Sequence, residues 1–180
     1  SSVSAVVFEP QSGRFLYEKD AHPARPMAST TKLMTALVAA RQLDPADTVR
    51  VPAGAVPVEG TQIGLTAGDE ITVRDLLAAL LLSSGNDAAN ALALLTDGSF
   101  SAFSARMEAC AQELGMTDSR FVTPSGLDAE GHAASAADMA RLGAAVLRVP
   151  VLAELCRSKT AQITLSGRRM TIKNHNKLLW

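Results

Sequence analysis

MASTTKLMTAL, residues 27–37, is the stretch on which the fold and the chemistry of this chain depend. Helix-forming residues follow Lys32, and apolar side chains recur among them at helical spacing. We therefore predict a helix from about Ser29 to Arg41. Because Lys32 follows Ser29 by three positions, both side chains would lie on one helix face, about 5–6 Å apart at Cβ.

The pair formed by Ser29 and Lys32 has two interpretations. Ser29 would stand in the first helical turn, where unpaired N–H groups and the positive dipole end stabilise an anionic oxygen. A buried Lys32 would lose proton affinity through desolvation and act as a base toward the Ser29 hydroxyl. The alternative is purely structural, since Ser is a common N-cap and Lys a common surface residue.

Composition limits the class of protein. The chain has 180 residues, 47% of them hydrophobic and 19% charged, which suits one domain with a substantial core. A formal net charge of −1 and the absence of a basic cluster argue against nucleic acid as a partner. No run of about 18 apolar residues is present, so we expect no membrane span. No signal peptide is visible, and the first residues suit a mature or trimmed start.

The cysteines and histidines do not indicate a metal site. Cys110 and Cys156 lack metal-type spacing, and we favour two buried thiols over a single disulfide. His22, His132 and His175 are scattered, without ligand spacing, so no metal is expected.

The order of predicted elements is hairpin, helices, hairpin. The first hairpin covers residues 3–18 and the second covers 160–174. Helices are expected at Val73 to about Leu82, Asp87 to Leu95, Phe100 to Leu114, and Ser135 to about Arg148, where Pro150 ends the last one. Leu43 to Val58 is loop-like. We therefore predict an α+β fold, an antiparallel sheet flanked by helices, with a mostly helical second lobe at about 42–150.

A second polar motif interrupts two apolar helices. Ser84-Gly85-Asn86 follows the apolar run 76–82, which we expect to be buried at the centre of the fold. Flanking helices that are both buried would place Ser84 and Asn86 at an interior junction. The alternative is an ordinary Ser-Gly-Asn turn.

The two motifs together resemble a known family. PMASTTKLMTA at 26–36 and LLSSGNDA at 81–88 resemble the first two motifs of serine-type penicillin-binding proteins, with flanks typical of the low-molecular-mass D-alanyl-D-alanine carboxypeptidases. Later stretches resemble the same family at 126–128, 131–132, 138–140 and 174–179. The resemblance covers nearly the whole chain and implies a β-lactamase/transpeptidase-like fold.

The resemblance implies a role for each motif residue. Ser29 would be the acylated nucleophile, with its backbone N–H as half of the oxyanion hole, and Lys32 would be the general base. Ser84 would relay a proton to the leaving amine. Asn86, with Gly85, would bind the substrate, and the Asn86 amide would also help to fix Lys32.

One family motif is missing from the sequence. Lys-Thr-Gly should follow the 174–179 stretch, but the chain stops at Trp180. The Lys159-Thr160 pair precedes that stretch and is followed by Ala, so we interpret Lys159 as a solvated hairpin residue. We therefore expect one domain over 1–180, incomplete at its C-terminus. The missing strands would come from a C-terminal segment of the same protein.

The resemblance implies a function and leaves alternatives. The substrate would be a peptidoglycan stem peptide ending in D-Ala-D-Ala, β-lactams would acylate Ser29, and no cofactor is implied. Carboxypeptidase and endopeptidase action are not separated. A serine β-lactamase or a non-catalytic peptidoglycan- or partner-binding domain on the same fold remain alternatives. The location would be extracytoplasmic, with any membrane attachment through a segment not in this chain.

Overall fold

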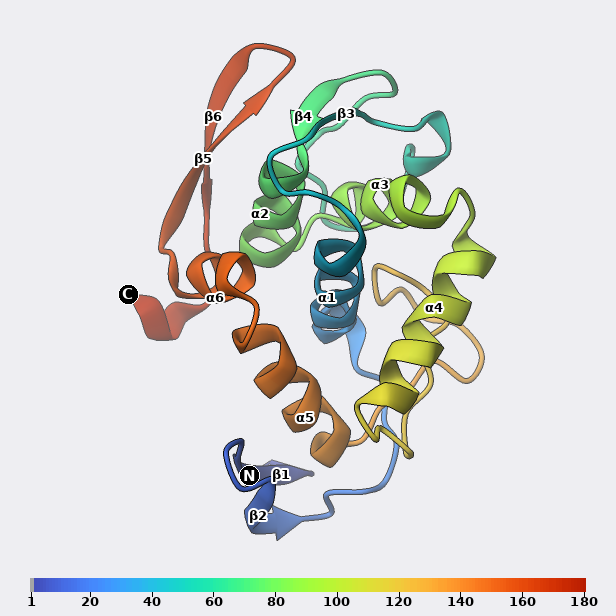
Figure 1. Cartoon of the computed structure of the whole chain (residues 1–180), viewed down its shortest axis with the longest axis vertical. Helices are drawn as coiled ribbons and strands as arrows, with labels where there is room; N and C mark the ends of the chain where they lie inside the picture. The colour runs from blue at the N-terminus through green and yellow to red at the C-terminus, as the bar shows by residue number, and fades with distance from the viewer. Residues whose placement is uncertain (1) are drawn as a thin grey trace.

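A computed structural model describes residues 2–180, in which helices and strands are mixed along the chain (Figure 1). The α-helices are α1 (Lys32–Gln42), α2 (Val73–Ser83), α3 (Asn86–Asp97), α4 (Phe100–Glu113), α5 (Ala136–Leu147) and α6 (Pro150–Arg157). The strands are β1 (Ala5–Glu9), β2 (Arg14–Lys19), β3 (Thr48–Arg50), β4 (Glu70–Thr72), β5 (Thr160–Leu165) and β6 (Arg168–Lys173). Short 3-10 helices are η1 (Ala28–Thr31), η2 (Ala53–Ala55) and η3 (Lys177–Leu179).

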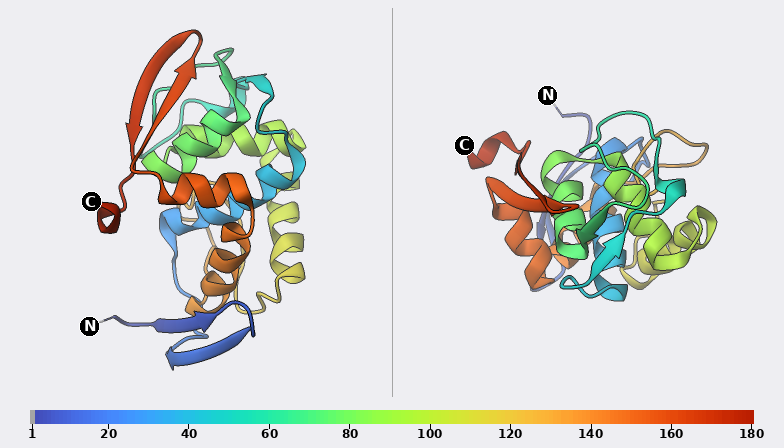
Figure 2. Two further views of the ribbon diagram at one scale, coloured as in Figure 1. Left: turned by 60° about the vertical axis from the view of Figure 1, so that its left-hand side comes forward. Right: turned by 90° about the horizontal axis from the view of Figure 1, so that it is seen from above.

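The strands pair as separate two-stranded antiparallel sheets, β1 with β2, β3 with β4, and β5 with β6. Figure 2 shows the β1–β2 hairpin at one end of the molecule and the β5–β6 hairpin at the other. Both hairpins form where the sequence predicted them, and the α+β fold with antiparallel strands is confirmed. Between the hairpins the chain is mostly helical.

The β3–β4 pair corrects one prediction. The sequence analysis expected 43–58 to be loop-like, whereas Thr48–Arg50 pairs with Glu70–Thr72. Each of these strands has three residues. That length is too short for the alternation of apolar and polar side chains that identifies a strand.

Side-chain caps start the helices that the sequence placed most accurately. The Thr72 hydroxyl accepts a hydrogen bond from the Asp75 N–H at 3.1 Å, and Ser135 accepts one from the Asp138 N–H at 3.1 Å. These caps satisfy N–H groups that have no helical partner, so α2 and α5 begin at the predicted positions.

Pro150 has a second role that the sequence analysis missed. As predicted, α5 ends before Pro150. The proline is also the first residue of α6, in which Leu152 and Leu155 are buried. Proline suits the first helical position because its fixed φ is helical and its missing N–H is not needed there.

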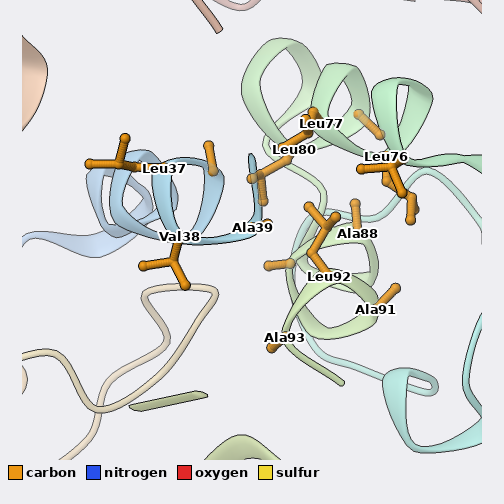
Figure 3. Packing of buried hydrophobic residues seen from close by; sticks show 14 of the residues in the cluster. Leu37, Val38, Ala39, Leu76, Leu77, Leu80, Ala88, Ala91, Leu92 and Ala93 are labelled. Carbon is orange, nitrogen blue, oxygen red and sulfur yellow. The ribbon is translucent and has the colours of Figure 1, made fainter. Parts of the chain in front are cut away.

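The core lies where α1, α2 and α3 meet. Figure 3 shows Leu80 of α2, Ala39 of α1 and Leu92 of α3 where these helices converge, and all three are buried. The apolar run 76–82 is buried apart from the partly exposed Leu81, as predicted. Since α1 packs against both neighbours, the residues at its N-terminus are carried on a rigid element.

Candidate active site

Ser29 lies in η1, the 3-10 turn that precedes α1. The sequence placed Ser29 at the start of the helix, but regular α-helix begins only at Lys32. The cause is Ala28, whose φ of 45° lies in the left-handed region and cannot begin an α-helix. The tight turn leaves Ser29 exposed while Thr31 and Lys32 are buried.

The Lys32 amine contacts the Ser29 hydroxyl. Its Nζ lies 3.1 Å from Ser29 Oγ and donates to the Ser125 carbonyl at 2.6 Å. The residue is 3% exposed, and no carboxylate in residues 2–180 forms a salt bridge with it. Burial without a counter-charge disfavours the ammonium form and lowers the pKa of Lys32 to about 8. An amine with this pKa and position can accept a proton from Ser29 Oγ.

The loop 122–132 packs beneath the Ser29 turn. The Thr35 hydroxyl, one turn along α1, donates to the Pro124 carbonyl at 2.6 Å. Gly126 has a φ of +84°, and a Cβ added there would stand 2.0 Å from the Ala28 carbonyl oxygen. Glycine is therefore required at this position by both its backbone conformation and the close approach of the turn.

A cavity of about 370 Å³ joins Ser29 and Lys32 with Ser84. Ser84 ends α2 in the left-handed conformation, with φ 57° and ψ 36°, and is half-buried. The cavity is also lined by Thr30, Leu33, Leu80, Leu81 and Asn176. The structure thus brings together the three residues that the sequence proposed as catalytic, from two separate motifs.

Asn176 is a cavity-lining residue to which the sequence analysis gave no role. The backbone N–H of His175 donates to the Leu82 carbonyl at 3.0 Å, which brings this segment beside the end of α2. The 174–179 stretch carried a family resemblance, but a contact between residues more than ninety positions apart leaves no signal in local spacing.

Asn86 and Gly85 are buried beside the cavity and do not line it. Asn86 Nδ2 donates to the Glu59 carbonyl at 2.7 Å, and the Asn86 backbone N–H donates to the Thr61 carbonyl at 2.7 Å. In the described part of the chain Asn86 makes no hydrogen bond to Lys32. Among residues 2–180 its Oδ1 has no hydrogen-bond partner, and the atom is not fully enclosed, so it remains available as an acceptor.

Asp87 holds the neighbouring loop against this second motif. Its carboxylate is fully buried and accepts hydrogen bonds at 3.0 Å from the backbone N–H groups of Ile63, Gly64 and Leu65. A Cβ at Gly85 would come within 2.8 Å of Asp87 Oδ1, so a side chain there would disturb this clamp. Asp87 and Asn86 together keep residues 59–65 over the start of α3.

Residues 2–180 contain no group of three His, Cys, Asp or Glu placed to hold a metal ion. Cys110 and Cys156 are free thiols, as the sequence favoured, although Cys156 is only half-buried. Burial raises the pKa of both thiols, which keeps them protonated and weakly nucleophilic.

The site pairs the exposed Ser29 hydroxyl with the buried Lys32 amine, and comparison with known proteins shows the family to which the chain belongs. Residues 1–180 match the peptidase S11 family, described as D-alanyl-D-alanine carboxypeptidase. The chain belongs to this family, as the sequence resemblance indicated.

Individual relatives agree with this assignment. The chain is 39% identical over 150 residues to the D-alanyl-D-alanine carboxypeptidase DacF of Bacillus subtilis, covering 81% of this chain and 39% of that protein. It is 37% identical over 176 residues to DacB2 of Mycobacterium tuberculosis, covering 97% and 60%. It is also 32% identical over 184 residues to the D-alanyl-D-alanine endopeptidase of Escherichia coli, covering 100% and 59%. The chain therefore spans between 39 and 60% of the length of these relatives.

Solved structures show the same fold. A crystal structure of D-alanyl-D-alanine carboxypeptidase from Mycobacterium tuberculosis H37Rv matches with a TM-score of 0.93 and 36% identity, covering 98% of this chain and 67% of that one. The Streptomyces K15 DD-transpeptidase matches with a TM-score of 0.90 and 29% identity, covering 98% and 74%. These values confirm the predicted transpeptidase-like fold.

We predict that Gly126→Ala destabilises the protein more than Gly68→Ala. Both glycines have φ near +87°, but a Cβ at Gly68 meets nothing within 4 Å whereas one at Gly126 meets the Ala28 carbonyl. Both variants lose about 1 kcal/mol from the left-handed backbone, and Gly126→Ala should lose about 1–3 kcal/mol more from overpacking. Urea unfolding measures the difference. Equal losses would mean that the Ser29 turn moves away from the loop without cost.

Proposed function

We propose that the protein is a serine-type D-Ala-D-Ala carboxypeptidase that removes the terminal D-alanine from peptidoglycan stem peptides. One observation carries the proposal. The buried Lys32 amine, with a pKa of about 8, stands 3.1 Å from the exposed Ser29 hydroxyl in a cavity that Ser84 also lines. Family membership and the named relatives support the substrate class.

The geometry supports acylation of Ser29 with Lys32 as base. The neutral Lys32 amine donates one N–H to the Ser125 carbonyl, which leaves its lone pair for the Ser29 proton. Ser29 Oγ then attacks the carbonyl carbon of the penultimate D-alanine, and the oxyanion that forms is stabilised by the Ser29 backbone N–H. Ser84 passes the proton from Lys32 to the amine of the terminal D-alanine as the peptide bond breaks.

Hydrolysis of the acyl-enzyme completes the reaction. Water attacks the ester on Ser29 Oγ, its proton passes to Lys32, and the Ser29 hydroxyl is restored as the shortened peptide leaves. In this proposal Asn86 Oδ1 accepts a hydrogen bond from a substrate amide, and Gly85 leaves room for the Asp87 carboxylate beside it. A β-lactam would follow the first half of this course and remain as an ester on Ser29.

Three alternative functions would use the same site: an endopeptidase, a non-catalytic binding domain and a serine β-lactamase. An endopeptidase would use the same pair on a cross-linked peptide, and one relative is named an endopeptidase. A non-catalytic binding domain would not need a desolvated amine in contact with an exposed serine, and a serine β-lactamase would need an efficient deacylation base. We therefore place carboxypeptidase action first.

Since peptidoglycan lies outside the cytoplasm, we also propose an extracytoplasmic location. No helix within residues 2–180 is long and apolar enough to cross a membrane. We also propose that any attachment to the membrane is made by a segment outside this chain.

We further propose that residues 1–180 form one domain that a following segment completes. Lys159 is exposed and stacks over the Trp180 ring at 5.5 Å, so it does not replace the missing Lys-Thr-Gly motif at the cavity. The β1–β2 hairpin leaves Val7, Leu16 and Tyr17 between 52 and 61% exposed. Strands paired with the open edge of this hairpin would satisfy its unpaired backbone N–H and C=O groups and would carry the third motif toward the cavity.

Penicillin should acylate Ser29 in the protein that includes this following segment. Intact mass should rise by one penicillin, and peptide mapping should place the adduct on Ser29. Ser29→Ala should abolish the adduct, whereas Ser101→Ala, an exposed serine on α4, should leave it unchanged. A label that survives Ser29→Ala would exclude Ser29 as the nucleophile.

Lys32→Arg should lose acylation although it keeps a positive charge, because a guanidinium stays protonated and cannot accept the Ser29 proton. We expect a fall of about 10²–10⁴ in the acylation rate. In the unchanged protein the rate should rise with pH until about 8, where the Lys32 amine becomes neutral. Lys159→Arg is the matched control and should leave the acylation rate unchanged. A Lys32→Arg variant within about tenfold of the parent would show that Lys32 supplies charge and no base.

Residues 1–180 expressed alone should acylate slowly, and the following segment should restore the rate when supplied covalently or as a second polypeptide. Loss of one oxyanion donor alone costs on the order of 10²–10³ in rate. The measurement is the acylation rate with and without the segment. Equal rates would require that the third motif is dispensable or lies within this chain.

A further inference from the structure

The His132 ring forms hydrogen bonds with two segments, the turn that carries Ser29 and the start of the 122–132 loop. The residue is 7% exposed. Its Nδ1 accepts a hydrogen bond from the Val122 backbone N–H at 2.9 Å, and the Thr123 N–H lies 3.4 Å from the same atom. Its Nε2 lies 2.9 Å from the Thr31 hydroxyl.

These contacts allow one protonation state. A backbone N–H can only donate, so Nδ1 must present a lone pair to Val122. The remaining ring proton is then on Nε2, where it is donated to Thr31 Oγ1. His132 is therefore neutral, with its proton on Nε2. A second proton on Nδ1 would face the Val122 N–H and break that hydrogen bond.

Thr31 ties one end of this bridge to the nucleophile. It is fully buried, and it is the last residue of the turn that carries Ser29. The turn contains Ala28 in the unfavourable left-handed conformation. Such backbone strain persists only when the surroundings hold it in place. The hydrogen bond from His132 to Thr31 is one such restraint.

Val122 ties the other end to the base. The loop that begins there continues to Ser125, whose carbonyl accepts from Lys32 Nζ at 2.6 Å. One imidazole ring therefore restrains both the turn that presents Ser29 and the loop that fixes the Lys32 amine.

We propose that His132 is a positioning residue whose neutral form holds Ser29 and Lys32 in reactive geometry, and whose protonation releases both. The proposal rests on the proposed function, because the reaction it controls is acylation of Ser29.

The charges around His132 set when this release occurs. Burial lowers the pKa of His132 below its usual value, and the nearby Asp128 carboxylate opposes that effect. Glu108 accepts from the neighbouring Phe121 N–H, and Arg120 approaches Gly131. Lys32 is the next residue after Thr31, the hydrogen-bond partner of His132 Nε2. Since burial is the larger effect, release should begin below about pH 6.5.

The test is the pH dependence of Ser29 acylation in the protein that includes the following segment. Protonation of Lys32 alone lowers the rate about tenfold per pH unit below about 8, and a second group that must be deprotonated makes this about a hundredfold per unit. The unchanged protein should therefore show a steeper acid limb below the pKa of His132. His132→Gln and His132→Asn keep an amide donor and acceptor but do not titrate, so their acid limb should stay near tenfold per unit.

Two further variants test the positioning role at pH 8. His132→Ala removes both contacts, and Thr31→Val removes only the acceptor for Nε2–H. Each should acylate about tenfold to a hundredfold more slowly, as expected for a misplaced nucleophile. The amide variants should keep more activity than His132→Ala. The proposal is overturned if the steep acid limb survives in both amide variants, or if Thr31→Val acylates at the parent rate.

Imidazole ¹⁵N chemical shifts of the unchanged protein provide a test that needs no variant. At pH 7 they should report a neutral ring protonated on Nε2, and a ring protonated on Nδ1 or charged at this pH would overturn the proposal. If the unchanged protein shows no acylation at pH 8, the proposed function fails. The ¹⁵N result still decides whether His132 holds Thr31 as proposed.

Discussion

The desolvation of Lys32 is the constraint on which the rest of the structure depends. An ammonium group enclosed by α1 and the 122–132 loop without a salt bridge from the described residues is disfavoured, and the pKa falls to about 8. In the proposed reaction, the same burial that opposes folding makes the amine able to accept the Ser29 proton near pH 8. The fold tolerates the buried Lys32 amine because the Ser125 carbonyl accepts a hydrogen bond from it. The exposed Ser29 hydroxyl lies 3.1 Å from the same nitrogen. Under the proposed function, a cost in folding is therefore tied to a gain in reactivity at this site.

Rigid packing around α1 keeps the Lys32 amine in contact with the Ser29 hydroxyl. The helix is buried between α2 and α3, so Lys32 cannot move outward to water without disturbing the core. The strained turn before it is restrained by Gly126 on one side and by the bond from His132 to Thr31 on the other. Backbone strain and tertiary restraint act together here, and neither places Ser29 alone.

Hydrogen bonds between the start of α3 and residues 59–65 organise the second motif, Ser84-Gly85-Asn86. Asp87 binds three consecutive backbone N–H groups of the 59–65 loop, and Asn86 donates back to the Glu59 carbonyl. This exchange turns the Asn86 amide so that its oxygen remains available. Ser84 then reaches the cavity from the left-handed end of α2, which a regular helix continuation would not allow.

Local chemistry was enough to predict much of this protein. Side-chain caps at Thr72 and Ser135, turn residues between alternating strands, and the apolar run 76–82 each act within a few residues, so the hairpins and most helices followed from the sequence. The Ser29–Lys32 spacing also predicted that these two side chains lie together, and they are in contact at 3.1 Å. The sequence did not reveal the three-residue strands β3 and β4, or the start of α6 at Pro150, because such short elements carry little periodicity. Only the tertiary structure decided that Ser125, His132 and Asn176 lie around Ser29, Thr31 and Lys32. These contacts join residues about a hundred positions or more apart, and their hydrogen bonds use backbone groups and a buried ring whose partners no local pattern specifies.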